Sequence, residues 1–143
     1  MVLTPSPENA AEIAALLLPF VESNYGYTLD YTPASLGQLD GIVDDLRRDQ
    51  HFEQLQPLLF SMGCYVGEVF VRTEQGRWRT AESMGLPAVT SSPVMIELPD
   101  GRGCNPVGRV YKRFRKGREE DLAWFYRALT TGAPERAPST NEE

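Results

Sequence analysis

The sequence predicts an α+β fold, in which about five helices pack around a small antiparallel sheet of two to three strands. Apolar residues recur three and four positions apart in most of the chain, which is the spacing of one helical face. Residues 94–98 are instead apolar and β-branched and lead into a Pro-Asp-Gly turn, which is typical of a strand. The length of 143 residues suits one domain, which we assign to residues 1–132, with a disordered polar tail over 133–143.

The first part of the chain predicts two helices. Residues 6–25 form the first, with Ser6 as its cap and Pro19 bending its second half. The second begins at Thr32 and carries four aspartates opposite its apolar face, which we interpret as a solvated surface. The linker between them, residues 25–31, holds three tyrosines. These could line a binding surface, although packing of a loop onto the core is the more frequent role of such residues.

The longest apolar run, in residues 57–78, is the centre of the predicted fold. Its side chains follow one continuous helical face, and Gly63 and Gly67 form a second stripe that another backbone can approach closely. The β-branched residues in this run also permit a hairpin over residues 65–73. We favour a helix that ends at Gly76, because the apolar face is continuous.

Glu68 lies inside this run and is the only charged residue between Glu53 and Arg72. A buried carboxylate must be paired, hydrogen-bonded or protonated. Glu68 is therefore either the acid of a functional site or a structural carboxylate bonded to an arginine or a backbone N–H, and the structural role is the more common one. The functional alternative groups Glu68 with Tyr65, Trp78 and Arg109 as the site of a small anionic ligand or a weak hydrolase.

After the central helix, residues 77–80 are expected to pair with residues 94–98, and Trp78 to cover one face of this sheet. The Gly-rich turn after this strand matches no phosphate-binding motif, so we favour a turn and a helix cap. An anion site stays the minor alternative, because a strand precedes the turn and a helix follows it. Asn105 and Pro106 then begin a new helix. The last helix is expected to start at the three acids that begin with Glu119.

The helix that begins at Asn105 is strongly basic. Residues 102–118 hold seven of the 14 Lys and Arg residues and no acid. Removing those seven positive charges from the net charge of −6 leaves −13 for the rest of the chain. The cations Arg109, Lys112 and Arg113 therefore either dock an acidic partner or compensate the acids of the neighbouring helices, and the sequence supports both alternatives equally.

Composition argues against most catalytic and cofactor chemistry. The chain has one histidine, His51, and no Gly-x-Ser-x-Gly element, so it contains neither a His–His metal pair nor a recognisable nucleophile site. We assign no catalytic residue, no metal and no cofactor. The acidic net charge argues against nucleic-acid binding. The chain start has no signal-peptide pattern, the apolar runs are too short for a bilayer, and both cysteines read as free thiols, so a cytoplasmic location is expected.

The central run and the segments after it resemble a group of small uncharacterised bacterial proteins over roughly residues 35–130. The shared pattern is a Gly-x-Tyr-x-Gly-Glu element, a Gly-x-Trp, a Pro-led helix and a final aromatic helix. In this chain the pattern is carried by Gly63, Tyr65, Gly67, Glu68, Gly76, Trp78 and Pro106. The resemblance implies an α+β domain whose central element is a helix, and it implies no known activity.

We therefore expect a small cytosolic bacterial protein that acts as a non-enzymatic protein-interaction module, of the kind of an immunity protein or an accessory factor. Its segregated charge would steer an acidic protein partner to the basic helix. The alternatives are a binder of a small anionic ligand, or a weak hydrolase, that uses Glu68, and in third place a nucleic-acid-binding protein. The sequence leaves the partner and the oligomeric state open.

Overall fold

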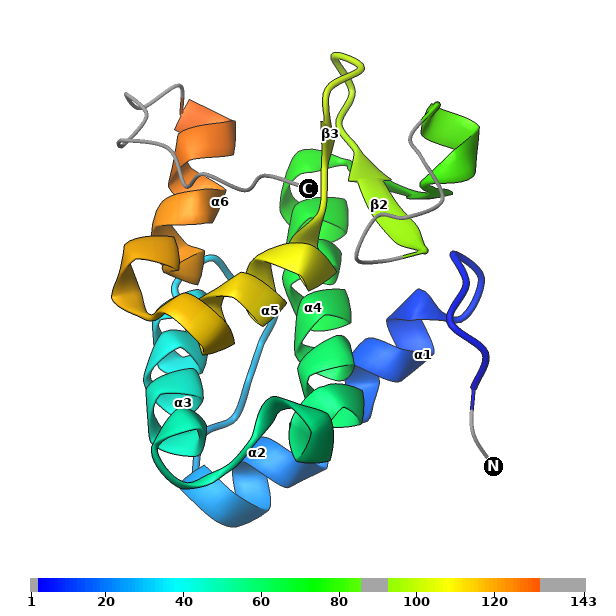
Figure 1. Cartoon of the computed structure of the whole chain (residues 1–143). Helices are drawn as coiled ribbons and strands as arrows, with labels where there is room; N and C mark the ends of the chain where they lie inside the picture. The colour runs from blue at the N-terminus through cyan, green and yellow to red at the C-terminus, as the bar shows by residue number, and fades with distance from the viewer. Residues whose placement is uncertain (1–2, 86–92, 132–143) are drawn as a thin grey trace.

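The computed structural model describes residues 3–85 and 93–131, and it confirms the α+β class (Figure 1). The described residues form six α-helices, two short 3-10 helices and one three-stranded antiparallel sheet. The elements in chain order are α1 (Ala10–Ala15), α2 (Leu17–Tyr25), α3 (Ser35–Asp49), α4 (Phe52–Glu74), β1 (Arg77–Thr80), η1 (Glu82–Met84), β2 (Val94–Glu97), β3 (Gly103–Cys104), α5 (Pro106–Lys116), η2 (Arg118–Glu120) and α6 (Leu122–Thr131). The tail predicted over 133–143 lies outside the described residues.

The segment predicted as the first helix forms two helices, so the structure has six α-helices in its described residues instead of the predicted five. Residues 6–9 form a turn instead of helix, closed by a hydrogen bond from Asn9 N to Ser6 O (3.1 Å). The helix is then interrupted at Leu16, between α1 and α2. Pro19 explains the position of the break, because it has no N–H to donate to the carbonyl four residues earlier and is tolerated only in the first turn of a helix. The interruption therefore falls before Pro19 and not after it.

Residues 65–73 belong to α4, so the hairpin alternative is wrong and the helix prediction is confirmed. All residues from 61 to 70 are buried, which means that this helix packs on every side and that packing outweighs the strand preference of its β-branched residues. The helix ends two residues before the predicted Gly76. Gln75 adopts a left-handed backbone conformation (φ 58°), and Gly76 N donates to Phe70 O (3.1 Å).

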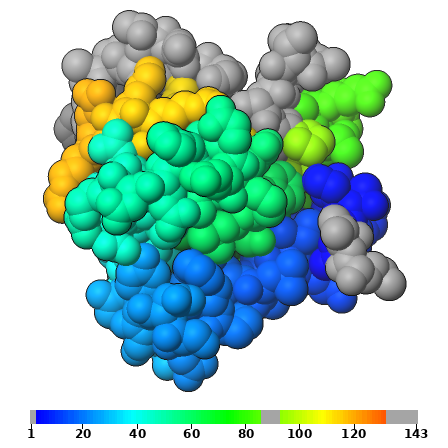
Figure 2. Space-filling model, turned by 60° about the horizontal axis from the view of Figure 1, so that its bottom comes forward, coloured from blue at the N-terminus to red at the C-terminus, as the bar shows by residue number. Residues whose placement is uncertain are grey.

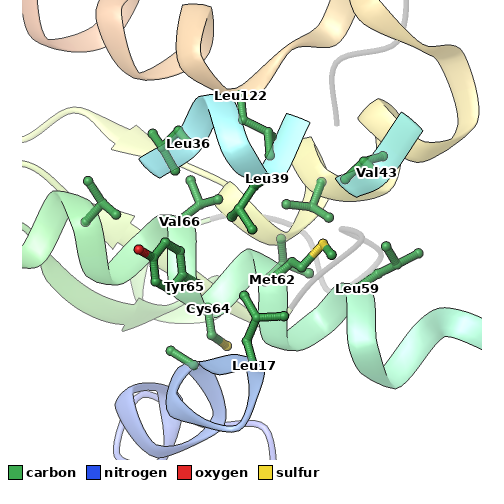
Figure 3. Packing of buried hydrophobic residues seen from close by; sticks show 14 of the residues in the cluster. Leu17, Leu36, Leu39, Val43, Leu59, Met62, Cys64, Tyr65, Val66 and Leu122 are labelled. Atoms are coloured by element: carbon green, nitrogen blue, oxygen red, sulfur yellow. The ribbon is translucent and has the colours of Figure 1, made fainter. Parts of the chain in front are cut away.

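The helix α4 is the centre of the fold. It contacts all five other helices together with β1 and β2, and Figure 1 shows it in green behind the crossing helix α5. Figure 3 shows the core around it, where Leu17 of α2, Leu39 of α3 and Leu122 of α6 converge on Met62 and its neighbours. Burying these apolar side chains is the main stabilising term of the fold.

The glycine stripe on α4 is a site of close approach, as its spacing predicts. A Cβ added at Gly63 would stand 2.5 Å from Cα of Val107 on α5. A Cβ at Gly67 would overlap the indole ring of Trp78. Side chains larger than hydrogen at these two positions would push α5 and β1 away from the central helix.

The sheet has the strand order β1-β2-β3, and the predicted pairing of residues 77–80 with the later strand is confirmed. Trp78 stands opposite Ile96, and Ile96 stands opposite Cys104 of β3. Asn105 then caps α5 by accepting a hydrogen bond from Gly108 N (2.9 Å), with Pro106 at the first helical position, as predicted. The Gly-rich segment before α5 thus forms the strand β3 and the N-cap of α5.

The last helix begins later than predicted. Residues 118–120 form η2, and α6 starts at Leu122 because Asp121 is extended and its Oδ1 accepts from Trp124 N (2.8 Å). Glu119 therefore precedes α6 and lies in the short 3-10 turn. None of the helices in residues 3–85 and 93–131 combines the length and the hydropathy needed to cross a bilayer.

Candidate functional site

The residues selected from the sequence fall into two separate groups in the structure. Tyr65, Glu68 and Trp78 belong to a polar cluster where α4 meets β1 and the α2–α3 loop. Arg109 does not join them, contrary to the ligand-site hypothesis. Its guanidinium pairs with Glu120 and lies 4.7 Å from the ring centre of Phe125.

Glu68 is buried, and both of its carboxylate oxygens accept hydrogen bonds. Trp78 Nε1 donates to Oε2 (2.8 Å), and Arg72 Nε donates to Oε1 (3.3 Å). Arg72 is one turn further along α4, so the pair is the i,i+4 contact that a helix favours. With its oxygens occupied and its side chain 6% exposed, Glu68 has the surroundings of a structural carboxylate.

A ladder of planar groups extends from Arg72. Its guanidinium lies 3.6 Å above the ring centre of Tyr31, and that ring stacks on Tyr65 with 4.6 Å between centroids. The Tyr65 hydroxyl accepts from Tyr31 N (2.7 Å) and shares a hydrogen bond with Ser35 Oγ (2.7 Å). Burial raises the pKa of Tyr65. The phenol is thus protonated and fully engaged, so it is not a candidate acid or base near neutral pH.

The Tyr31 backbone is left-handed (φ 63°), which is uncommon for a bulky residue. Two sets of contacts hold it there. Tyr31 N donates to the Tyr65 hydroxyl, and the Tyr31 ring lies between the Tyr65 ring and the Arg72 guanidinium. Sequence reasoning identified Tyr65 and Glu68 but missed Tyr31, Ser35 and Arg72 as their partners. The i,i+4 spacing of Glu68 and Arg72 could have revealed one of them, whereas the other contacts cross thirty or more positions.

The basic helix α5 turns part of its charge inward. Arg113 is 1% exposed, and its Nε donates to Asp40 Oδ1 (2.9 Å) on α3. Its Nη1 lies 2.9 Å from Asp44 Oδ1 but is not aligned for a hydrogen bond, so that contact is electrostatic. Burial would lower the pKa of Arg113, but Asp44 and Asp40 outweigh it and raise that pKa. In return, Arg113 lowers the pKa of Asp44.

Asp40 also positions the last helix. Its two oxygens accept from Leu122 N (2.8 Å) and Ala123 N (3.2 Å), in addition to Arg113. One carboxylate on α3 thereby fixes α5 and the start of α6. The aspartates that the sequence predicts as a solvated face are therefore divided, because Asp40 and Asp44 form ion pairs with Arg113 and only Asp49 of the four is exposed. For Asp40 and Asp44 that prediction is wrong.

The remaining cations of α5 differ in exposure. Arg109 is partly buried by its pair with Glu120, and Lys112 is partly exposed. Arg115 is exposed and lies 3.9 Å from the ring centre of Phe52, and Lys116 is exposed. The buried and partly buried cations thus precede the two exposed ones, which lie in the last turn of the helix.

A cluster of exposed cations surrounds Gly117, where α5 ends. Arg47 Nε donates to Phe114 O (2.6 Å), and its Nη2 donates to Arg115 O (3.1 Å). Arg118 follows Gly117 and pairs through Nη2 with Asp44 (3.1 Å), while its side chain remains 83% exposed. We define Arg47, Arg115, Lys116 and Arg118 as the basic end of α5.

The described residues offer no group of His, Cys, Asp or Glu arranged to hold a metal ion. Cys64 and Cys104 are buried and free, and burial raises the pKa of both thiols to about 12. Neither thiol is therefore in the low-pKa state of a reactive cysteine. Comparison with family models, curated proteins and solved structures finds no match for this chain. The resemblance to small bacterial proteins stays a prediction.

Proposed function

We propose that this chain is a non-enzymatic protein-interaction module that binds an acidic surface of a partner protein through the basic end of α5. The observation that carries the proposal is the gathering of four exposed cations around Gly117, contributed by the ends of α3 and α5 and by η2. Like charges held close together repel one another and gain little stability. An acidic partner would relieve that repulsion and be steered toward the surface.

The docking surface in this proposal is narrower than the whole basic helix. Arg113 forms ion pairs with Asp40 and Asp44, and Arg109 forms one with Glu120, so neither guanidinium is free for a partner. What remains of the helix for docking is its C-terminal turn, where Lys116 is exposed. Internal compensation and partner docking, which the sequence presents as alternatives, are then assigned to different cations of the same helix.

The two other candidate functions receive less support. A ligand site at Glu68 would need a free carboxylate, but its oxygens accept from Trp78 and Arg72. Nucleic-acid binding would need a row of cations along a groove or a helix face. The basic end is instead a compact cluster next to Asp44, on a chain with a net charge of −6.

The test is affinity capture from a lysate of the native host with the tagged full chain, with and without nuclease. The docking variant is the double reversal Lys116→Glu and Arg118→Glu. A matched control is the double reversal Arg77→Glu and Arg127→Glu, which makes the same change in charge at exposed residues. Each double variant also loses one exposed ion pair. The docking variant loses Arg118–Asp44, and the control loses Arg77–Glu97.

We expect one protein partner to be captured by the wild type and the control, to be lost with the docking variant and to survive nuclease. Capture that persists in the docking variant would contradict the proposal. If the captured material disappears on nuclease treatment, nucleic-acid binding would replace protein docking as the proposed function. The affinity for nucleic acid should then fall steeply with salt. Circular dichroism of all three proteins must show the same helical content for the comparison to hold.

A further inference from the structure

A hollow of about 300 Å³ lies on the opposite side of α3 from its contacts with Arg113. It opens between the end of α2, the end of α3 and the turn after α3. Figure 2 turns this part of the molecule toward the viewer, with α2 in blue beside the teal end of α3. The lining residues are Phe20, Asn24, Tyr25, Asp45, Leu46, Asp49 and Gln50.

The hollow carries negative charge from two sources. Asp45 and Asp49 are one turn apart on α3, and Asp49 has no ion-pair or hydrogen-bond partner in the described part of the chain. The backbone adds to this, because α2 and α3 both end here and the C-terminal end of a helix carries partial negative charge. The last turn of α2 contains no basic residue to offset it.

This placement is unfavourable for the free protein. Acids at a helix C-terminus oppose the dipole, and two acids four positions apart repel each other. Arg48 offsets part of the charge by pairing with Asp45 Oδ1 (2.6 Å), but its side chain is 65% exposed. Arg47 is directed at the carbonyls of α5 instead. A guest cation would therefore bind where the protein's own cations leave charge uncompensated.

Two aromatic rings, Phe20 and Tyr25, line one side of the hollow. Tyr25 stacks with Tyr27 at 6.5 Å between ring centroids and contacts Phe20 at 6.2 Å. Its hydroxyl donates to Asp45 Oδ2 (2.6 Å), which ties the ring to the acidic side of the hollow. Burial and the bond to Asp45 raise the pKa of Tyr25 to about 12, so the phenol stays protonated and keeps donating. An aromatic face beside a carboxylate suits a planar cation that stacks and donates two hydrogen bonds.

We propose that this hollow accepts the guanidinium group of an arginine side chain from a partner protein. Asp49 receives the charge-assisted hydrogen bonds, and Tyr25 and Phe20 supply the stacking surface. Arginine fits better than lysine because its flat, delocalised head uses both the ring face and the carboxylate. The proposal does not depend on the basic end of α5, since the two surfaces share no residue.

The test is an NMR titration of the full, 15N-labelled chain with the capped tripeptide acetyl-Gly-Arg-Gly-amide. Peptides with lysine or with neutral citrulline in place of arginine are the matched ligands. We expect weak binding, with a Kd on the order of 1 mM, because a single side chain contributes little surface. Shift changes should centre on Asn24, Tyr25, Leu46 and Gln50, and the citrulline peptide should cause none.

The acid is tested with Asp49→Asn and with the control Glu12→Gln, an exposed acid of α1 away from the hollow. We expect Asp49→Asn to weaken binding about fivefold, as for a partly exposed charge pair, and Glu12→Gln to leave it unchanged. Tyr25→Leu should reduce the preference for arginine over lysine, because it removes the stacking face.

The proposal is overturned if the arginine peptide causes no shifts at about 10 mM, ten times the expected Kd. It is also overturned if citrulline binds as well as arginine, or if Glu12→Gln weakens binding as much as Asp49→Asn. Equal binding of the lysine peptide would overturn the choice of guanidinium. Both acid variants are at exposed positions, and their spectra without peptide report directly whether the fold is retained.

Discussion

Arg113 and Lys116 stand three residues apart on α5 and have opposite surroundings. Arg113 is buried between Asp40 and Asp44, whereas Lys116 faces solvent at the end of the helix. The helical repeat places both residues on the same face, so the difference arises from their positions along the helix. Arg113 lies where α5 packs against α3, whereas Lys116 is the last residue of α5. A basic helix is thus not one surface with one role. Its inward charges join elements of the fold, and only its outward charges are available to a partner.

Removing the inward charge should have the largest effect. We expect Arg113→Met to lower the free energy of unfolding by about 3 kcal/mol. The substitution leaves the Asp40 carboxylate near the core without its cation, and it leaves Asp44 with only the exposed Arg118. Urea denaturation measures the change. The control Lys116→Met should shift the same quantity by less than about 0.5 kcal/mol. Equal effects of the two substitutions would show that the comparison is mistaken.

The acids of α4 allow the same comparison, because Glu68 is buried and Glu53 is exposed on the same helix. We expect Glu68→Gln to cost about 1–2 kcal/mol of unfolding free energy, because the amide cannot serve both Arg72 and Trp78 as the carboxylate does. Glu53→Gln, an exposed position on the same helix, is the control. A Glu68→Gln protein with unchanged stability but a lost binding activity would argue for a functional carboxylate instead.

Low pH should weaken the ion pair between Arg113 and Asp44. Arg113 lowers the pKa of Asp44 from its ordinary 3.8, so the contact contributes stability that is fully present above pH 3.8. The contribution is lost as the pH falls through the lower pKa of the folded protein. We expect the stability difference between wild type and Asp44→Asn, measured by thermal denaturation from about pH 6 to about pH 2, to shrink below pH 3.8. A constant difference over that range would contradict the assignment.

The smallest effect is expected at the outward charges. Lys116→Glu combined with Arg118→Glu removes only one exposed ion pair and should change the unfolding free energy by less than about 1 kcal/mol. Chemical denaturation of this variant beside wild type provides the measurement. A larger loss would mean that the basic end of α5 is needed for folding, and its role as a docking surface would lose its main argument.

The fold class, the central helix and the strand pair can be predicted from the sequence because they depend on local periodicity. The sequence of residues 65–73 also permits a hairpin, since a helix buried on every side lacks the polar face that would distinguish it from a strand. The break at Leu16 was misplaced because the effect of Pro19 reaches one turn back along the chain. These are boundary errors, and the element types stand.

The candidate site was less predictable than the fold, because its contacts cross long distances in the sequence. The spacing along α5 separates apolar from basic positions, but it does not reveal that Asp40 is the acid that meets Arg113. The hollow beside Tyr25 was equally hidden, since it forms only where α2 and α3 end side by side. The sequence shows the tyrosines of the linker, but the acids beside Tyr25 come from another helix.

Asp40 has a consequence for how the chain is made. Its partners Arg113 and Leu122 follow it by 73 and 82 residues, so a ribosome must synthesise the chain through Leu122 before both contacts of this carboxylate can form. The ten residues of α6 are too few for a stable helix in isolation. We therefore expect α6 to form as it docks on Asp40, so that during synthesis the contacts of this carboxylate are completed only after both α5 and the start of α6 have been made.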